Sequence, residues 1–185
     1  MPDAASPKPE KPAEVRFWDF SLAAYAKPGV APACLALQER HGLDVNLLLY
    51  CGWSGRRGRR LGREELAALD AKVAAWRSEV VLPLRGVRRW MKTQETAPGE
   101  QAQALREEIK RLELEAERIE QDLLSASAEE SAGEASPQAA ASNMRLYLGF
   151  LGAEISITDI ADLAAVLTGC FGEVPPLEAV WLFED

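Results

Sequence analysis

The sequence has 185 residues, of which 48% are hydrophobic and 27% are charged, and its formal net charge is −8. These values are ordinary for a globular domain and exclude a wholly disordered chain or a collagen-like repeat. No run of 18 apolar residues is present, so we expect no membrane-spanning helix and no membrane partner. The first residues lack the apolar stretch of a secretory signal, and the cysteine count of three is odd. Both features favour a reducing, cytoplasmic location.

Residues 1–13, which contain four prolines, are predicted to form a disordered tail. Apolar spacings of three and four residues over most of the remaining chain predict an all-α fold, a helical bundle with one long amphipathic helix. Residues 14–126 are expected to form a helical domain, and residues 127–137 a flexible linker. Residues 138–185 are expected to add a C-terminal helical segment packed on the same core.

The elements can be placed from their apolar stripes and capping residues. Asp44 and either Ser156 or Thr158 are good N-caps, and Pro83 is expected to bend or break its helix. The expected helices cover residues 14–26, 30–41, 44–53, 62–79, 80–92, 98–125, 143–151 and 155–171.

The long helix over residues 98–125 has a heptad pattern. Its apolar residues step by four and three, which is the spacing of a coiled-coil seam. A lone helix cannot bury such a stripe, so we expect it to pair within the domain, with a second copy or with another protein. The candidate pairing residues are Leu105, Ile109, Leu112, Ile119 and Leu123, with Ala116 completing the stripe.

The charge is unevenly distributed along the chain. Residues 54–92 contain 11 basic and four acidic residues, whereas residues 93–136 contain four basic and 12 acidic residues. The basic block therefore either faces acidic segments of the same chain or binds an anion or an acidic partner. Its candidate residues are a loop of Arg56, Arg57, Arg59 and Arg60, and a helical stripe of Arg85, Arg88, Arg89 and Lys92.

A polar cluster is the candidate ligand pocket. Gln38 and His41 lie one helical turn apart and are expected to face a cavity together with Tyr25 and Asn46. Capping of helices is the simpler alternative for His41 and Asn46. No nucleophile motif, zinc-protease motif or phosphate-binding loop occurs, so no catalytic residue is assigned.

The three cysteines, Cys34, Cys51 and Cys170, have apolar neighbours and are expected to be buried thiols. A zinc site needs about four nitrogen or sulfur ligands at close spacing. The chain has one histidine and no Cys-x-x-Cys pair, so we predict no metal site and no cofactor.

Two motifs carry a resemblance to a known family. Residues 17–53 read FWDFSLAAYAKPGVAPACLALQERHGLDVNLLLYCGW, and residues 76–92 read WRSEVVLPLRGVRRWMK. They resemble an uncharacterised proteobacterial family, a domain of unknown function found in short cytoplasmic proteins. The resemblance covers roughly residues 15–125. It implies membership of that family and no particular activity.

Three functions remain open at this point. The heptad helix and the charge asymmetry favour a non-enzymatic cytoplasmic interaction or adaptor protein that binds a protein partner or forms a homodimer. The first alternative is a small-molecule-binding protein or enzyme with a pocket around Gln38 and His41. The second is a nucleic-acid- or ribosome-associated protein that uses the arginine loop. It is not favoured, because no aromatic residue interleaves with the arginines to stack on bases.

Overall fold

The computed structural model describes residues 15–93, 99–126, 128 and 133–184. Every regular element in this part of the chain is a helix, which confirms the predicted all-α class. The predicted tail over residues 1–13 lies outside the described residues, as do residues 127 and 129–132 of the predicted linker over residues 127–137.

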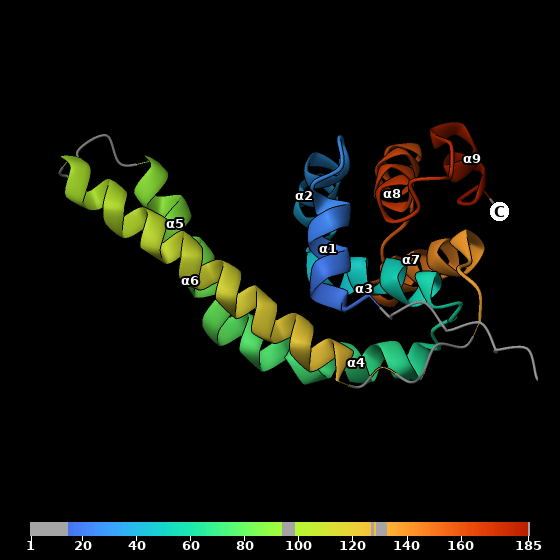
Figure 1. Ribbon diagram of the computed structural model, residues 1–185, viewed down its shortest axis with the longest axis horizontal. Helices are drawn as coiled ribbons and strands as arrows, with labels where there is room; N and C mark the ends of the chain where they lie inside the picture. The colour runs from blue at the N-terminus through green and yellow to red at the C-terminus, as the bar shows by residue number, and fades with distance from the viewer. Residues whose placement is uncertain (1–14, 94–98, 127, 129–132, 185) are drawn as a thin grey trace, which may run out of the picture.

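Six helices form a rounded body in which α3 lies at the centre (Figure 1). The aromatic rings of Phe17, Tyr50 and Trp53 pack together in its core, with ring centroids 5.3–5.6 Å apart. The C-terminal helices contribute Met144, Leu163 and other side chains to the same core. The helices of the body are α1 (Phe17–Tyr25), α2 (Val30–His41), α3 (Val45–Arg56), α7 (Pro137–Phe150), α8 (Ile157–Cys170) and α9 (Pro176–Trp181).

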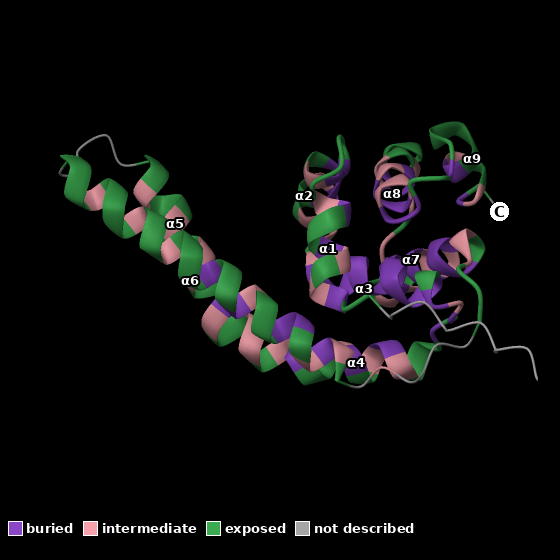
Figure 2. Cartoon of the chain, in the orientation of Figure 1, coloured by how far each residue is buried: buried purple, intermediate pink, exposed green. Residues whose placement is uncertain are grey.

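Two long antiparallel helical segments form an arm that projects from this body (Figure 1). The first segment consists of α4 (Arg63–Trp76), the π-helical stretch η1 (Arg77–Val81) and α5 (Leu82–Thr93). The second is α6 (Gly99–Ser125). Buried residues concentrate in the body and at the base of the arm, whereas no residue of α5 is buried (Figure 2). The distal half of the arm therefore has a large exposed surface.

The sequence predicts a bend or a break at Pro83. The structure shows no break there, because the helix continues through the π-helical stretch η1 into α5. In η1 the backbone amide of Leu82 donates to the carbonyl oxygen of Arg77, five residues earlier. Proline lacks an amide hydrogen, and its ring clashes with the carbonyl four residues earlier in a regular α-helix. The wider turn just before Pro83 accommodates this clash while the segment continues toward the tip of the arm.

The capping predictions near the site agree with the structure. The carboxylate of Asp44 accepts a 2.8 Å hydrogen bond from the amide of Asn46 and begins α3. Ser156, rather than Thr158, begins α8, in a capping box with Asp159. The start of α7 was predicted too late: this helix begins at Pro137, inside the expected linker.

The face that α6 buries differs from the predicted heptad stripe. Its buried residues include Glu113, Ala116 and Glu120, whereas Leu105 is 56% and Leu112 is 45% exposed. The line of buried residues is offset by about one position from the line of Leu105, Leu112 and Ile119. One position corresponds to about 100° around an α-helix. Of the candidate pairing residues, Ile109 and Leu123 are half-buried, while Leu105, Leu112 and Ile119 are exposed.

Helix α3 and helix α7 approach each other closely at Gly55. A Cβ atom at this position would lie 2.6 Å from both the backbone nitrogen and the Cα of Ala140. We expect Gly55→Ala to lower the free energy of unfolding by about 1–3 kcal/mol, because backbone atoms of α7 cannot move aside without cost. Urea denaturation measures the effect. The control is Gly149→Ala on α7, where a Cβ would meet no atom within 4 Å and stability should not fall.

Among the described residues, no single helix is long and apolar enough to cross a membrane. Helices α1 and α2 pass the length and composition test only as a pair, and they are bent by 99° to each other.

Candidate functional site

Asp44 connects the body to the base of the arm. Besides capping α3, its carboxylate forms an ion pair with Arg77, in which Oδ2 of Asp44 lies 2.8 Å from Nη1 of Arg77. The guanidinium of Arg77 also donates to Asp70 at 2.9 Å. The backbone amide of Asp44 donates to the hydroxyl of Tyr147 at 2.8 Å. One aspartate at a helix start thus contacts both the arm and α7.

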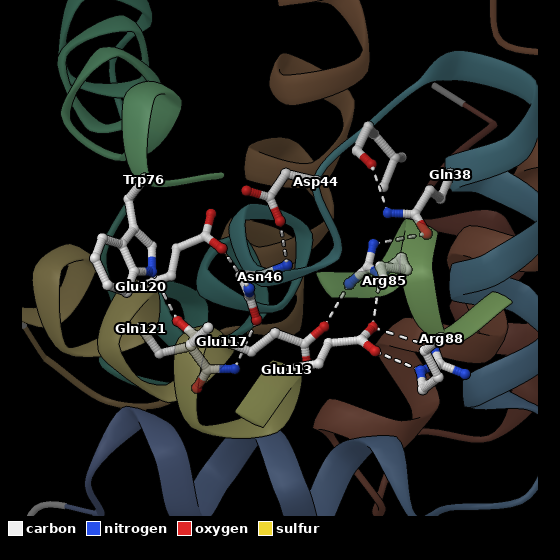
Figure 3. Close-up of polar contacts among 12 residues, drawn as sticks. Gln38, Asp44, Asn46, Trp76, Arg85, Arg88, Glu113, Glu117, Glu120 and Gln121 are labelled. Atoms are coloured by element: carbon white, nitrogen blue, oxygen red, sulfur yellow. Dashed lines mark hydrogen bonds and ion pairs between the residues drawn. The ribbon is translucent and has the colours of Figure 1, made fainter. Parts of the chain in front are cut away.

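A buried chain of amide and hydroxyl groups continues this junction (Figure 3). The Asn46 side chain donates to Oε2 of Glu120 at 3.1 Å and accepts from Nε2 of Gln121 at 2.8 Å. Gln121 in turn accepts from the hydroxyl of Ser21 at 2.7 Å. These contacts connect α1, α3 and α6 and explain why α6 turns polar side chains toward the body.

The basic stripe on α5 meets acidic residues of α6 (Figure 3). Arg85 donates through Nε to Glu113 at 3.0 Å, and it also pairs with Glu117. Arg88 makes a bidentate contact with Glu113, in which Nη2 of Arg88 donates to Oε1 of Glu113 at 3.1 Å and Nε pairs with Oε2. Arg85 further donates to the side-chain oxygen of Gln38 at 3.3 Å, which ties the arm to α2. Two of the four stripe residues are therefore paired within the chain.

A cavity of about 340 Å³ lies between the body and the arm and is bounded by these ion pairs. Tyr25, Gln38 and Asn46 line it, so three of the four residues predicted for a pocket meet there. Arg85, Arg88 and Arg89 line the opposite wall. Three residues predicted for a pocket and three residues of the predicted basic stripe thus lie around one cavity, whereas Lys92 does not line it.

Burial raises the pKa of two groups in this cavity. It is the main reason that the pKa of the Tyr25 hydroxyl lies above its usual value. Burial also raises the pKa of Glu117, although the charge of Arg85 and its hydrogen bond act to lower it. The Tyr25 hydroxyl therefore stays protonated as a hydrogen-bond donor over the whole neutral range.

His41, the fourth predicted pocket residue, lies elsewhere. Its Nε2 is 2.8 Å from Oδ1 of Asp159, which also pairs with Arg40 at 2.8 Å. Burial by itself would raise the pKa of Asp159, but hydrogen bonds from Ser156, His41 and Arg40 hold it well below its ordinary value. His41 therefore connects α2 to the start of α8, and its grouping with the cavity was wrong.

The arginine loop is less accessible than expected. Arg57 and Arg59 are 8% and 7% exposed, with Arg57 over the ring of Trp53 and Arg59 paired with Glu65 at 2.9 Å. Arg56 lies over the ring of Phe171 and pairs with Glu173 at 2.7 Å. Arg60 is exposed. Arg57 and Arg59 pack into the body, which argues against these two as candidates for binding an anion or an outside partner.

The exposed leucines of α6 form a second feature, the outer face of the arm. We define this outer face by Leu105, Leu112 and Ile119 on α6 and Val87 on α5. At about 100° per residue, the α6 members lie on the flank opposite Gln121, which faces the body. Val87 lies about 200° around α5 from the cavity-lining Arg89. The four are 38–56% exposed and carry no charge.

The cysteines and acidic clusters add no further chemistry. All three cysteines are free and buried, and burial raises the pKa of the Cys34 thiol to about 12. Such thiols are protonated and unreactive at neutral pH. Within the ranges that the structure describes, no three His, Cys, Asp or Glu side chains are placed to hold a metal ion together.

Several residues of the junction were missed at the sequence level. Trp76 and Arg77 fall within the helix expected over residues 62–79, with no role assigned to them, yet Nε1 of Trp76 donates to the carbonyl oxygen of Ala116 at 2.9 Å. Pairing of the basic block with acidic segments of the same chain was one of two alternatives left open, but no individual acidic residue of α6 was named as a partner. A usable signal existed, because Glu113, Glu117 and Glu120 follow helical spacing just as Arg85 and Arg88 do.

Comparison with known proteins gives one match. No curated protein and no solved structure matches the chain. The family described as "Protein of unknown function (DUF2390)" matches residues 16–124, which include α1 to α5 and nearly all of α6. Both halves of the body–arm cavity lie within the matched region, whereas α7, α8 and α9 lie beyond it. More than half of the chain is matched, and the protein therefore belongs to the DUF2390 family.

Proposed function

We propose that this protein is a cytoplasmic interaction protein whose arm binds a second copy of the chain through its outer face. The single observation that carries the proposal is the outer face itself. Leu105, Leu112 and Ile119 repeat every seven residues and remain exposed in the folded chain. Large contiguous apolar surfaces on folded proteins mark interaction sites.

The position of the outer face supports an intermolecular role. It lies on the flank of the arm that faces away from the body, and Leu105, Leu112 and Val87 are 45–56% exposed there. Seven-residue spacing on a helix is suited to packing against another helix. A helical hairpin with one apolar flank can bury that flank by pairing with another hairpin into a four-helix arrangement.

A second copy is the occupant that fits this surface most simply. Two-fold pairing brings the same patch of each subunit together, so an uncharged patch meets an uncharged patch. The free, buried state of the three cysteines fits a reducing compartment and thus a cytoplasmic location.

Analytical ultracentrifugation tests the proposal. We expect a concentration-dependent dimer for the wild type. The double variant Val87→Asp/Leu112→Asp should weaken dimerisation by at least about tenfold, because it places two carboxylates in an apolar interface. Circular dichroism should show an unchanged helix content, because both side chains are about half exposed in the subunit.

The matched control is Leu177→Asp on α9, where the leucine is 66% exposed and distant in sequence from the arm. This variant should dimerise like the wild type. A wild type that remains monomeric at all concentrations would refute the proposal. So would a control variant that loses dimerisation as fully as the arm variant does.

A further inference from the structure

The body–arm cavity contains more positive charge than its own carboxylates neutralise. Glu113 and Glu117 are occupied by Arg85 and Arg88. Asp44, the other carboxylate in the wall, is paired with Arg77. Two further cations also line the cavity.

Those two cations are Arg89 on α5 and Lys110 on α6. Arg89 is exposed and makes no ion pair with any described residue. Lys110 is 65% exposed, and its Nζ lies 3.9 Å from Glu107, which does not line the cavity. Each of the two therefore has donors available toward the opening of the cavity.

The rest of the wall is apolar. Leu22 on α1, Leu35 on α2 and Leu114 on α6 are 45%, 46% and 47% exposed, and all three line the same cavity. The ring of Trp18 also lines it. Isolated exposed leucines are common, but three from three helices around one cavity form a local apolar surface. A volume of about 340 Å³ lies within the range of small-molecule pockets.

We infer that the cavity between the body and the arm binds a small amphipathic anion, namely a carboxylate attached to an apolar chain. The carboxylate lies between Arg89 and Lys110, whose positive charges are not paired with a carboxylate of the cavity wall. The chain covers Leu22, Leu35 and Leu114 and removes their surface from water. The Tyr25 hydroxyl, protonated at neutral pH, adds a neutral donor deeper in the cavity. This site is separate from the outer face of the arm and does not depend on dimerisation.

Isothermal titration calorimetry with dodecanoate tests the inference. We expect saturable binding of one dodecanoate per chain. Acetate carries the same charge without the apolar chain, and dodecylammonium carries the same chain with the opposite charge. Neither should bind at concentrations that saturate the site with dodecanoate. Equal binding of dodecylammonium, or no saturable binding of dodecanoate, would overturn the inference.

Two variants locate the site. Arg89→Glu/Lys110→Glu should weaken dodecanoate binding by about tenfold or more, since it replaces two attractions by two repulsions. Leu114→Trp should weaken it by filling the cavity. The control Arg60→Glu/Arg111→Glu makes the same change in net charge at exposed positions that do not line the cavity. This control should bind within about twofold of the wild type. If the control loses binding as strongly as Arg89→Glu/Lys110→Glu, dodecanoate does not bind in this cavity.

Discussion

Replacing Glu113 with alanine should lower the free energy of unfolding by about 3 kcal/mol, because it leaves two half-buried arginines without their shared carboxylate. Glu113 is only 5% exposed, and the side chains of Arg85 and Arg88 are 16% and 24% exposed. Burial alone would raise the pKa of Glu113, but hydrogen bonds from Arg88 and Arg85 hold it below its ordinary value. The carboxylate is therefore ionised in the folded protein at neutral pH.

Urea denaturation at pH 7 measures this loss, and hydrogen exchange shows where it occurs. Amides of α5 should exchange faster in Glu113→Ala, while those of α3 and α7 should not, because Glu113 attaches α5 to α6. A carboxylate with a lowered pKa stabilises the fold above its unfolded pKa, and this contribution disappears as pH falls through the folded pKa. The variant should therefore differ least from the wild type in acid.

The matched control for this prediction is Glu108→Ala on the same helix. Glu108 pairs with Arg111 at 3.1 Å, but the two side chains are 63% and 66% exposed. Exposed pairs contribute little, so the control should lose at most about 0.5 kcal/mol. Equal losses in the two variants would show that the cluster of Glu113 with Arg85 and Arg88 does not hold the arm together.

The starts of α3 and α8 were predictable because capping is a local interaction. Asp44 caps a backbone amide two residues ahead, and Ser156 caps one three residues ahead. The buried stripes of α2 and α4 were also predictable, since apolar side chains occupy them. In each case the deciding interaction lies within one helix or follows from burial of apolar area.

The buried face of α6 was not predictable by the same rule. An apolar stripe is expected to face the core, but here the buried line contains Glu113, Glu120 and Gln121. These side chains form hydrogen bonds with groups from distant parts of the chain, such as Arg85 and Asn46. Spacing within one helix does not reveal which distant helix supplies a partner.

The candidate site was predictable only in part, for similar reasons. Tyr25, Gln38 and Asn46 do line one cavity, whereas His41 faces α8 instead. Arg57 was a candidate for binding an anion or an acidic partner. Its guanidinium in fact packs over the Trp53 ring, 4.4 Å from the centroid, a contact that depends on tertiary packing.

Replacing Glu120 with glutamine should stabilise the protein by about 1–3 kcal/mol at pH 8 and have almost no effect near pH 4. Glu120 is fully buried, and its Oε1 has no hydrogen-bond partner among the described residues. Burial, followed by the neighbouring Asp44 carboxylate, raises its pKa from 4.5 to about 9. The folded protein thus keeps this side chain protonated at neutral pH, at a free-energy cost relative to the unfolded chain.

The sign of the effect follows from proton counting. Between pH 4.5 and about 9 the folded state binds a proton at Glu120 that the unfolded state has lost, so stability falls as pH rises through this window. Below pH 4.5 both states are protonated and the slope disappears. Glutamine can still accept from Asn46 and has an amide donor for the carboxylate of Asp44, but it does not titrate.

Urea denaturation of the wild type and Glu120→Gln at several pH values between 4 and 9 measures the difference. The two curves should coincide in acid and diverge steadily as pH rises, with the variant the more stable wherever they differ. Glu115→Gln, an exposed position on the same helix, should follow the wild type throughout. If Glu120→Gln is instead less stable than the wild type at pH 8, Glu120 is ionised in the folded protein. Its negative charge, attracted to Arg77, then helps to hold the arm against the body.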